Sequence, residues 1–467
     1  MKRLTLESFL KQSHPSAMQK VFLVLSMSLP AILAQLTSIA MQYIDAGMVG
    51  SLGAAATGAI GLVSSTTWLM NGMCVGMSSG FSVQVAQLVG AGRKSEAADV
   101  LRQALKILFC CSFLLMVFCI SISCGLPVFL GADEAIREDA SRYFFIYACG
   151  LPFAQIRQLS AAMMQCSGDM KTPSVLAGMV CVLDVIFNYF LIFPTRTVAA
   201  AGLELTVFGA GLGVEGAALG TALSEVVIGL LMLYFTAIRS PILNLRRKGD
   251  WKLKKKTVVT AVKIAVPMTL DHIFLCSAYV AGTLLIAPLG TVAVAANSLA
   301  VTAESLCYMP GYGIGSASTA IIGQTLGAER LDLTRSFSRL TVLLGMVLMG
   351  FTGMIMFGIA PVVFQFLTTD GTVASLGTQM LRIELFAEPL YGASICCAGV
   401  FRGAGDTLFP SIMNLVSMWG VRILLAFFLI PVFGLKGYWI AMTVELCFRG
   451  LIFLFRLKYG RWMKRVL

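Results

Sequence analysis

Charged residues are scarce in this sequence, and their scarcity excludes most classes of soluble protein. Only 12% of the 467 residues are Asp, Glu, Lys or Arg, whereas a soluble globular domain carries about 25%. Hydrophobic residues make up 58% of the chain, and its mean hydropathy is +0.85. This composition predicts an all-α polytopic membrane protein, because a backbone in lipid satisfies its polar groups within helices.

The residues of common catalytic and metal sites are also few. There are two histidines, His14 and His272, and the sequence contains neither an H-E-x-x-H motif nor a P-loop. The thirteen cysteines form no C-x-x-C pair and lie mostly in apolar segments, which favours packing over disulfides or metal binding. We therefore expect no enzyme, no catalytic residue and no bound cofactor.

Long apolar runs are abundant, and a bilayer-spanning helix needs about 20 such residues. The sequence predicts twelve spans, near residues 18–45, 56–83, 100–124, 140–165, 174–194, 211–238, 258–287, 292–322, 336–367, 375–400, 410–431 and 434–457. An even number of spans places both termini on the same side of the membrane.

Most of the thirty-five Lys and Arg fall in the segments that lie on the side of the termini. Because cytoplasmic loops carry the excess of Lys and Arg, we expect a plasma-membrane protein with both termini in the cytoplasm. The net charge of +12 is then mainly a topology signal. The basic run at 246–256 is expected to be an anchoring loop near lipid headgroups and no nucleic-acid site.

One sequence frame occurs twice, at a constant offset along the chain. Pro30 corresponds to Pro267, Gly53 to Gly290, and the pair Gly168-Asp169 to Gly405-Asp406, while the first half carries an insertion after Pro194. Six spans per copy predict two parallel-repeat bundles related by an axis along the membrane normal. The expected domains are an N-terminal lobe at 1–238, a basic linker at 239–257 and a C-terminal lobe at 258–467.

Two glycine patterns have structural interpretations. Gly72, Gly76 and Gly80 lie at successive i+4 positions, which favours close helix packing over a hinge, although the two are compatible. Residues 211–216 satisfy G-x-G-x-x-G, but we expect no preceding strand and hence no dinucleotide site.

Acidic residues inside apolar spans are the informative charges, because an ionised group in hydrocarbon is costly. They are Asp45, Asp184, Glu225, Asp271, Glu304, Glu384, Glu388 and Glu445. Asp184 and Asn188 share one helical face, and we expect them to converge with Asp45 into a coupling site for Na⁺ or H⁺. The repeat places Gly282 where the first copy has Asp45, so the shared frame does not require this acid.

Structural alternatives exist for these acids. Asp45 can cap its helix at the water interface, and Asp184 can pair with a buried arginine such as Arg157. Glu225 and Glu445 have nearby partners, so we interpret them as structural. Glu304, Glu384 and Glu388 either form a second cationic subsite or pair with Arg382 and Arg422, and Gln35 and His272 are further candidates for a substrate subsite.

Several of these stretches resemble the multidrug and toxic compound extrusion (MATE) transporter family over nearly the whole chain. They are Pro30 with Ile44 to Gly50 and Leu52-Gly53, the turn Gly168 to Pro173, and the turn Arg402 to Asp406. The resemblance implies V-shaped lobes and export of organic, often cationic compounds or drugs in exchange for Na⁺ or H⁺. It also implies that Pro30 is the bending proline of the first span and Asp45 the cation-coupling acid.

The sequence departs from the family pattern at two places. The family usually has Asn followed by Asp at the i+4 position in the fifth span, whereas this chain has Asp184 and then Asn188. Some members have a glutamate in the span-seven position that Leu275 occupies in this chain. The N-terminal lobe is therefore the better candidate ion site.

Two other functions remain open at this point. One is a lipid-linked oligosaccharide flippase of the same superfamily, because Arg157, Lys263, Arg382, Arg422 and Arg449 can make a cavity cationic. The other is a non-transporting membrane scaffold or receptor. The exporter is expected to act as a monomer in the lipid bilayer on small organic molecules.

Overall fold

The structure is a computed structural model that describes residues 6–10, 12, 15–200 and 203–463. His14 lies outside the described residues. The elements of the first half are α1 (Leu6–Leu10), α2 (Ala17–Gly50), α3 (Ala54–Gly90), α4 (Lys94–Ile122), α5 (Leu126–Phe129), α6 (Glu134–Ser167), α7 (Lys171–Ile192), β1 (Pro194–Ala200), β2 (Leu203–Ala210), α8 (Gly213–Tyr234) and the π-helical turn η1 (Phe235–Arg239).

The second half repeats this order of long helices. Its elements are α9 (Lys255–Ile286), the 3₁₀ turn η2 (Ala287–Leu289), α10 (Thr291–Gly327), α11 (Leu331–Leu367), α12 (Gly371–Glu384), α13 (Glu388–Ala404), α14 (Leu408–Leu415), the π-helical segment η3 (Val416–Ile423), α15 (Leu424–Phe433) and α16 (Leu435–Tyr459). The all-α polytopic fold with two repeated bundles is confirmed.

Eight of the described helices are long and apolar enough to cross a membrane, and the bent pair α12 and α13 makes a ninth span. Three more long helices, α3, α6 and α16, run beside them with 37, 34 and 25 residues. This arrangement is consistent with the twelve expected spans. Many helices are longer than their apolar runs, because their polar ends extend beyond the hydrocarbon layer.

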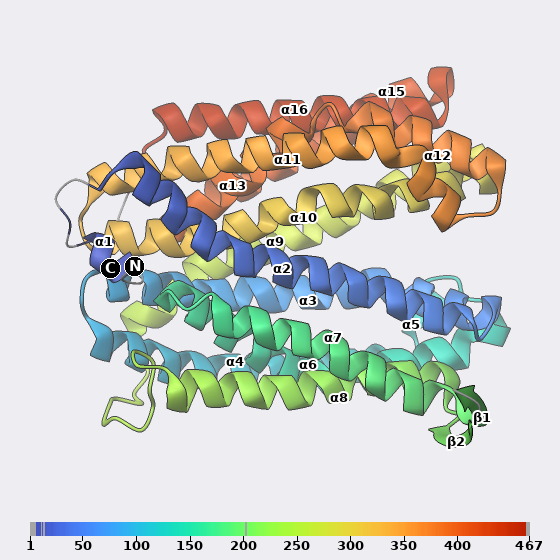
Figure 1. Ribbon diagram of the computed structural model, residues 1–467, viewed down its shortest axis with the longest axis horizontal. Helices are drawn as coiled ribbons and strands as arrows, with labels where there is room; N and C mark the ends of the chain where they lie inside the picture. Colours follow the sequence, from blue (N-terminus) through green and yellow to red (C-terminus); the bar gives the residue numbers. More distant parts are fainter. Residues whose placement is uncertain (1–5, 11, 13–14, 201–202, 464–467) are drawn as a thin grey trace.

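The helices run roughly parallel to the long axis of the molecule, and the two bundles lie side by side across it (Figure 1). Helices α4, α6 and α8 lie on one side and α11, α13 and α16 on the other, while α2, α3, α9 and α10 meet between them. One end of the molecule holds α1, which packs in the same cluster as Trp462 just after α16. We call this the α1 end, and we call the opposite end, which carries β1 and β2, the hairpin end.

The two copies contact each other through equivalent positions. A Cβ added at Gly76 of α3 would lie 2.7 Å from Thr269 Oγ1 of α9, and one added at Gly313 of α10 would lie 2.6 Å from the backbone nitrogen of Ile32 in α2. Gly313 is the repeat equivalent of Gly76, and Thr269 is that of Ile32. The glycines therefore allow close helix approach, which is the packing interpretation of their spacing.

Near the α1 end, a reciprocal pair of hydrogen bonds joins the two bundles. Gln87 Nε2 of α3 donates to the carbonyl oxygen of Gly403 (3.3 Å), and Gln324 Nε2 of α10 donates to that of Cys166 (2.8 Å). The two donors are repeat equivalents of each other, and so are the two acceptors. We call these two bonds the glutamine seal.

Glycines beside the glutamine seal bring the two backbones into contact, and this makes a stability prediction. A Cβ added at Gly327 would lie 2.0 Å from the Gln87 carbonyl oxygen. We expect Gly327→Ala to lower the free energy of unfolding by about 1–3 kcal/mol, because the packed helices must separate. The matched control is Gly50→Ala, where an added Cβ meets nothing within 4 Å. Thermal unfolding of both purified variants in detergent checks the difference, and equal melting temperatures would contradict it.

Two predictions about local structure were wrong. The insertion after the fifth span forms an antiparallel hairpin of β1 and β2, so a strand does precede the G-x-G-x-x-G stretch at 211–216. The motif still has no dinucleotide context, because no parallel strand follows α8 among the described residues. The tenth span is also not one helix, since α12 and α13 meet at an angle of 62°.

The basic linker folds back onto α4. Asp250 N donates to Asp99 Oδ1 (3.0 Å), Lys254 N donates to Gln103 Oε1 (2.9 Å), and Arg102 donates to the carbonyl of Arg247 (2.6 Å). These bonds attach the connection to the first bundle. The exact lobe boundaries at 238 and 258 stay a prediction.

Candidate functional site

Three polar side chains meet between α2 and α7. Asn188 Nδ2 donates to Asp45 Oδ1 (3.0 Å) and to Asp184 Oδ2 (2.9 Å). Asp184 and Asn188 are fully buried, whereas Asp45 is half-buried. One amide therefore bridges two carboxylates, and the structure brings together all three residues of the expected coupling site.

Helix α8 completes the wall of this centre. Ser224 Oγ lies 3.4 Å from Asp184 Oδ1, and a Cβ added at Gly220 would lie 2.1 Å from Asn188 Oδ1. Only a glycine at position 220 leaves room for the Asn188 amide. The Asn188 Oδ1 atom itself has no hydrogen-bond partner among the described residues, which leaves one amide oxygen free beside two carboxylates.

This arrangement suits a small cation. Two carboxylates at close range favour the binding of a proton, because one charge disfavours the other. Carboxylate and amide oxygens are also the ligands that hard cations prefer. Within the described part of the chain, no three His, Cys, Asp or Glu side chains are placed to hold a metal ion. A sodium ion here would therefore need Asn188 as well as Asp45 and Asp184.

The two structural alternatives for these acids were wrong. Asp45 does not cap its helix, because α2 continues to Gly50. Asp184 does not pair with Arg157, since the Arg157 guanidinium bonds Glu225 at 2.5 Å. That ion pair agrees with the structural interpretation of Glu225.

Glu445 of α16 is likewise structural. Its carboxylate accepts hydrogen bonds from Arg422 (2.6 Å), from Arg449 (2.7 Å) and from Ser417. Glu445 is fully buried and both guanidinium groups are at most one-tenth exposed. We call Arg422, Glu445 and Arg449 the charge triad.

The remaining acids of the second bundle lie near the break between α12 and α13. Glu384 ends α12, Glu388 begins α13, and Glu304 lies on α10; all three are buried. Pairing with Arg382 or Arg422 was wrong, because Arg382 donates to the Phe357 carbonyl (3.1 Å) and Arg422 belongs to the charge triad.

The carboxylates of Glu384 and Glu388 have no hydrogen-bond partner among the described residues. A buried carboxylate without a partner is far more stable when it is protonated. These two side chains therefore suit a proton better than a metal ion.

The remaining candidates are Pro30, Gln35 and His272. Pro30 is inside α2, and Gln35 is half-buried further along this helix. The His272 ring packs edge-on against Trp68 of α3 at a centroid distance of 6.3 Å. His272 thus joins the two bundles and is not part of the Asp45 centre.

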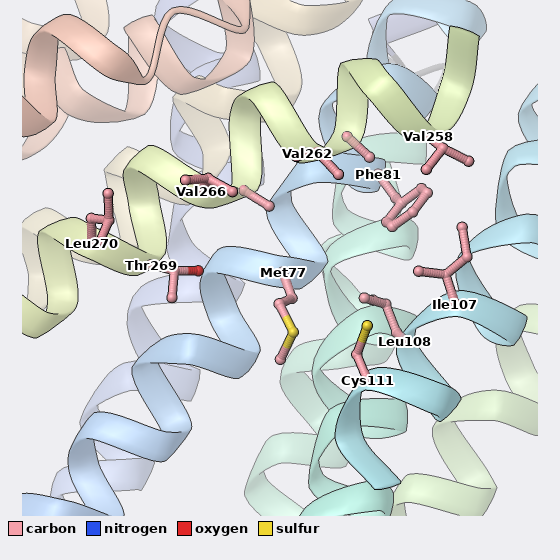
Figure 2. A pocket seen from close by; sticks show the side chains of 12 residues that line it. Met77, Phe81, Ile107, Leu108, Cys111, Val258, Val262, Val266, Thr269 and Leu270 are labelled. Atoms are coloured by element: carbon pink, nitrogen blue, oxygen red, sulfur yellow. The ribbon is translucent and has the colours of Figure 1, made fainter. Parts of the chain in front are cut away.

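A separate cavity of about 300 Å³ lies between α3, α4 and α9 (Figure 2). Its lining is apolar apart from the Thr269 hydroxyl, and includes Met77, Phe81, Ile107 and Val262. Because no carboxylate lines it, this cavity cannot neutralise a cation. A larger cavity of about 1350 Å³ lies at the α1 end, between α1, α2 and the loops near Arg93 and Gly168.

Sequence reasoning missed one further polar pair. Asn414 Nδ2 of α14 donates to both oxygens of Asp271 in α9, at 3.2 and 3.1 Å. The signal that was available is the spacing: Asp271 and Asn414 are separated by 143 residues, and so are Asp45 and Asn188.

The chain matches one known family and several known proteins. The MatE family model matches residues 30–190 and again residues 267–428, so the two matches begin at the equivalent prolines Pro30 and Pro267. The chain is 24% identical to the "Probable multidrug resistance protein NorM" of Thermotoga maritima, over 95% of this chain and 93% of that protein. It is 25% identical to the "Multidrug resistance protein MdtK" of Yersinia pestis strain Pestoides F, over 95% of each chain.

Solved structures share the same fold. The crystal structure of MATE in complex with MaL6 superposes with a TM-score of 0.86 at 18% identity, covering 95% of this chain and 97% of that one. A transporter of the MOP superfamily from Pyrococcus furiosus superposes with a TM-score of 0.85 at 16% identity, covering 96% and 98% of the two chains. At these identities the likeness concerns the fold.

Proposed function

This chain belongs to the MatE family, and we propose on that basis that it is a secondary active multidrug exporter. It antiports organic, often cationic and amphipathic compounds out of the cell in exchange for Na⁺ or H⁺. Both termini and the α1 end face the cytoplasm of a cell whose plasma membrane the chain crosses. The protein works as a monomer in lipid and carries out no covalent chemistry.

One observation carries this proposal: Asn188 bridges Asp45 and Asp184 inside the first bundle. The ionised pair is unfavourable in a buried setting unless a cation or a proton neutralises one charge. The fraction of molecules with a cation or proton bound at this pair therefore depends on the ion gradient. Binding of that ion can favour one arrangement of the bundles over another.

Transport follows when the two lobes, 1–238 and 258–467, rock against each other at the interface that α2, α3, α9 and α10 form between them. The closed glutamine seal supports an arrangement in which the cytoplasmic side is shut. Pro30 interrupts the hydrogen bonding of α2 between the α1 end and Asp45, which provides a bending point in the helix that carries the coupling acid.

The flippase alternative has less support. A flippase would need free positive charge in its cavity to hold a pyrophosphate, but Arg157, Arg422 and Arg449 are ion-paired with glutamates. Arg382 donates to a backbone carbonyl and packs on the Phe357 ring at 5.0 Å. The scaffold alternative predicts no dependence on any gradient.

Reconstitution tests the exporter directly. In proteoliposomes loaded with a fluorescent organic cation, we expect release to accelerate when a Na⁺ gradient or a pH gradient is imposed, with one of the two dominant. Liposomes without protein and liposomes with both gradients collapsed are the controls. Release that is equal with and without every gradient would overturn secondary active transport and favour the scaffold alternative.

A further inference from the structure

The second bundle contains a counterpart of the Asp45–Asn188 pair at a different depth. Asp271 and Asn414 lie on α9 and α14, the repeat equivalents of α2 and α7. Asp271 precedes Gly282, the position equivalent to Asp45, on the same helix. Asp271 and Gly282 are about three helical turns apart. Asp271 therefore lies on the same helix face as Gly282, about 16 Å closer to the α1 end.

Asp271 differs from the other acids of the second bundle in its access. Glu304, Glu384, Glu388 and Glu445 are buried, whereas Asp271 is half-buried. A proton is small enough to reach a buried carboxylate, whereas an organic molecule can contact only a carboxylate with exposed surface. Within the described part of the second bundle, Asp271 is therefore the membrane acid that a larger ligand can contact.

The amide orients this carboxylate without neutralising it. Asn414 is uncharged and donates to both oxygens of Asp271. Arg402 and Arg449 lie within electrostatic range of Asp271. Neither forms an ion pair with Asp271 in the described structure, and Arg449 is bonded to Glu445. The negative charge of Asp271 thus stays available to a ligand.

Two tyrosines with exposed rings lie on the same helix as this carboxylate and on α10. Tyr279 follows Asp271 by eight residues on α9, a rise of about 12 Å, and Tyr312 of α10 is near enough for the charge of Asp271 to act on it. Both tyrosines are 38% exposed although both stand in the middle of long helices. Trp68 of α3 packs on Tyr279 at 6.0 Å and extends the aromatic surface to the other bundle.

We propose that Asp271, oriented by Asn414, binds the positive charge of the exported compound, and that the Tyr279, Tyr312 and Trp68 rings hold its apolar body. Aromatic faces attract organic cations through cation–π contacts. A small hard cation usually takes about six or more oxygen ligands, and among the described residues no group of three His, Cys, Asp or Glu side chains includes Asp271. Arg402 and Arg449 repel positive charge, and the single negative charge of Asp271 can offset only one positive charge on the ligand. The preferred ligands are therefore organic cations with one positive charge.

This inference rests on the proposed exporter function and assigns the substrate charge to the second bundle, leaving the Asp45 centre to the coupling ion. It is tested by equilibrium binding of radiolabelled tetraphenylphosphonium to the purified full-length chain in detergent, without any gradient. We expect Asp271→Asn to weaken binding at least about 10-fold, the loss typical of removing one close charge partner. Asp271→Glu keeps the charge and is expected to retain binding.

The matched control is Asp332→Asn, which removes an exposed acid at the start of α11 and should leave tetraphenylphosphonium affinity within about two-fold, because an exposed ion pair contributes little. Competition by uncharged triphenylphosphine oxide should be equal in wild type and Asp271→Asn. If the wild type binds the cation and Asp271→Asn binds it equally well, the inference is wrong while the exporter function stands. If the wild type binds none, the proposed substrate class fails together with the site.

Discussion

Asp45→Asn is expected to abolish ion-driven export while the protein still inserts and folds normally. The amide of asparagine can still meet Asn188, but it carries no charge that a cation or proton can neutralise. If the ion binds both arrangements of the lobes equally well, an ion gradient cannot shift the population from one arrangement to the other. Gradient-dependent release from proteoliposomes should therefore fall by more than about 10-fold, to the rate seen without a gradient.

The control for Asp45→Asn is Asp332→Asn at the surface. Asp332 pairs with Arg330 at 2.9 Å and is 61% exposed, so this ion pair contributes little. The guanidinium lowers the pKa of Asp332 to about 2, which keeps it ionised at every pH of the assay. Full gradient-dependent release by Asp45→Asn, with insertion equal to the control, would remove Asp45 from the mechanism.

Glu445→Ala should have the largest effect on stability of any single change considered. It removes the shared acceptor of the charge triad and leaves Arg422 and Arg449 as unpaired buried charges. Breaking a buried ion pair by removing one partner costs about 3–5 kcal/mol. We expect a large fall in the melting temperature of the detergent-solubilised protein and a low yield of monodisperse material.

The comparison for Glu445→Ala is Glu96→Ala, which breaks an exposed pair with Arg93 and should shift the melting temperature little. A variant with all three charge-triad residues replaced by Met should be more stable than Glu445→Ala, because no charge is then left unpaired. Equal melting temperatures for Glu445→Ala and Glu96→Ala would show that the charge triad does not stabilise the second bundle.

The spans and their duplication could be predicted because a bilayer imposes a minimum apolar length and because insertions between the copies are few. The hairpin of β1 and β2 could not be predicted, because it belongs to an insertion that has no counterpart in the second copy and is too short to span a bilayer. The break after Glu384 had a local signal that was overlooked. Pro389 stands in the first turn of α13, a position that proline favours at a new helix start.

Only part of the candidate site could be predicted from the sequence. The i+4 spacing of Asp184 and Asn188 predicts a shared face, but it cannot show that the amide reaches across to Asp45. The partners of Arg157, Arg382 and Arg422 depend on which helices are neighbours, which periodicity alone does not determine. Asp271 was already evident as an acid inside a span, but its partner Asn414 could be found only through the spacing of 143 residues that Asp45 and Asn188 share.

The glutamine seal joins the lobes through two hydrogen bonds, and the repeat relates each of these bonds to the other. The two bonds differ in length, 3.3 and 2.8 Å, but each lobe supplies one donor and one acceptor, so any separation of the lobes at the α1 end must break equivalent bonds on both sides. The two copies have thus stayed equivalent where the lobes meet at the α1 end and differ at Asp45 and Gly282, where the proposed function assigns the coupling ion to one lobe alone.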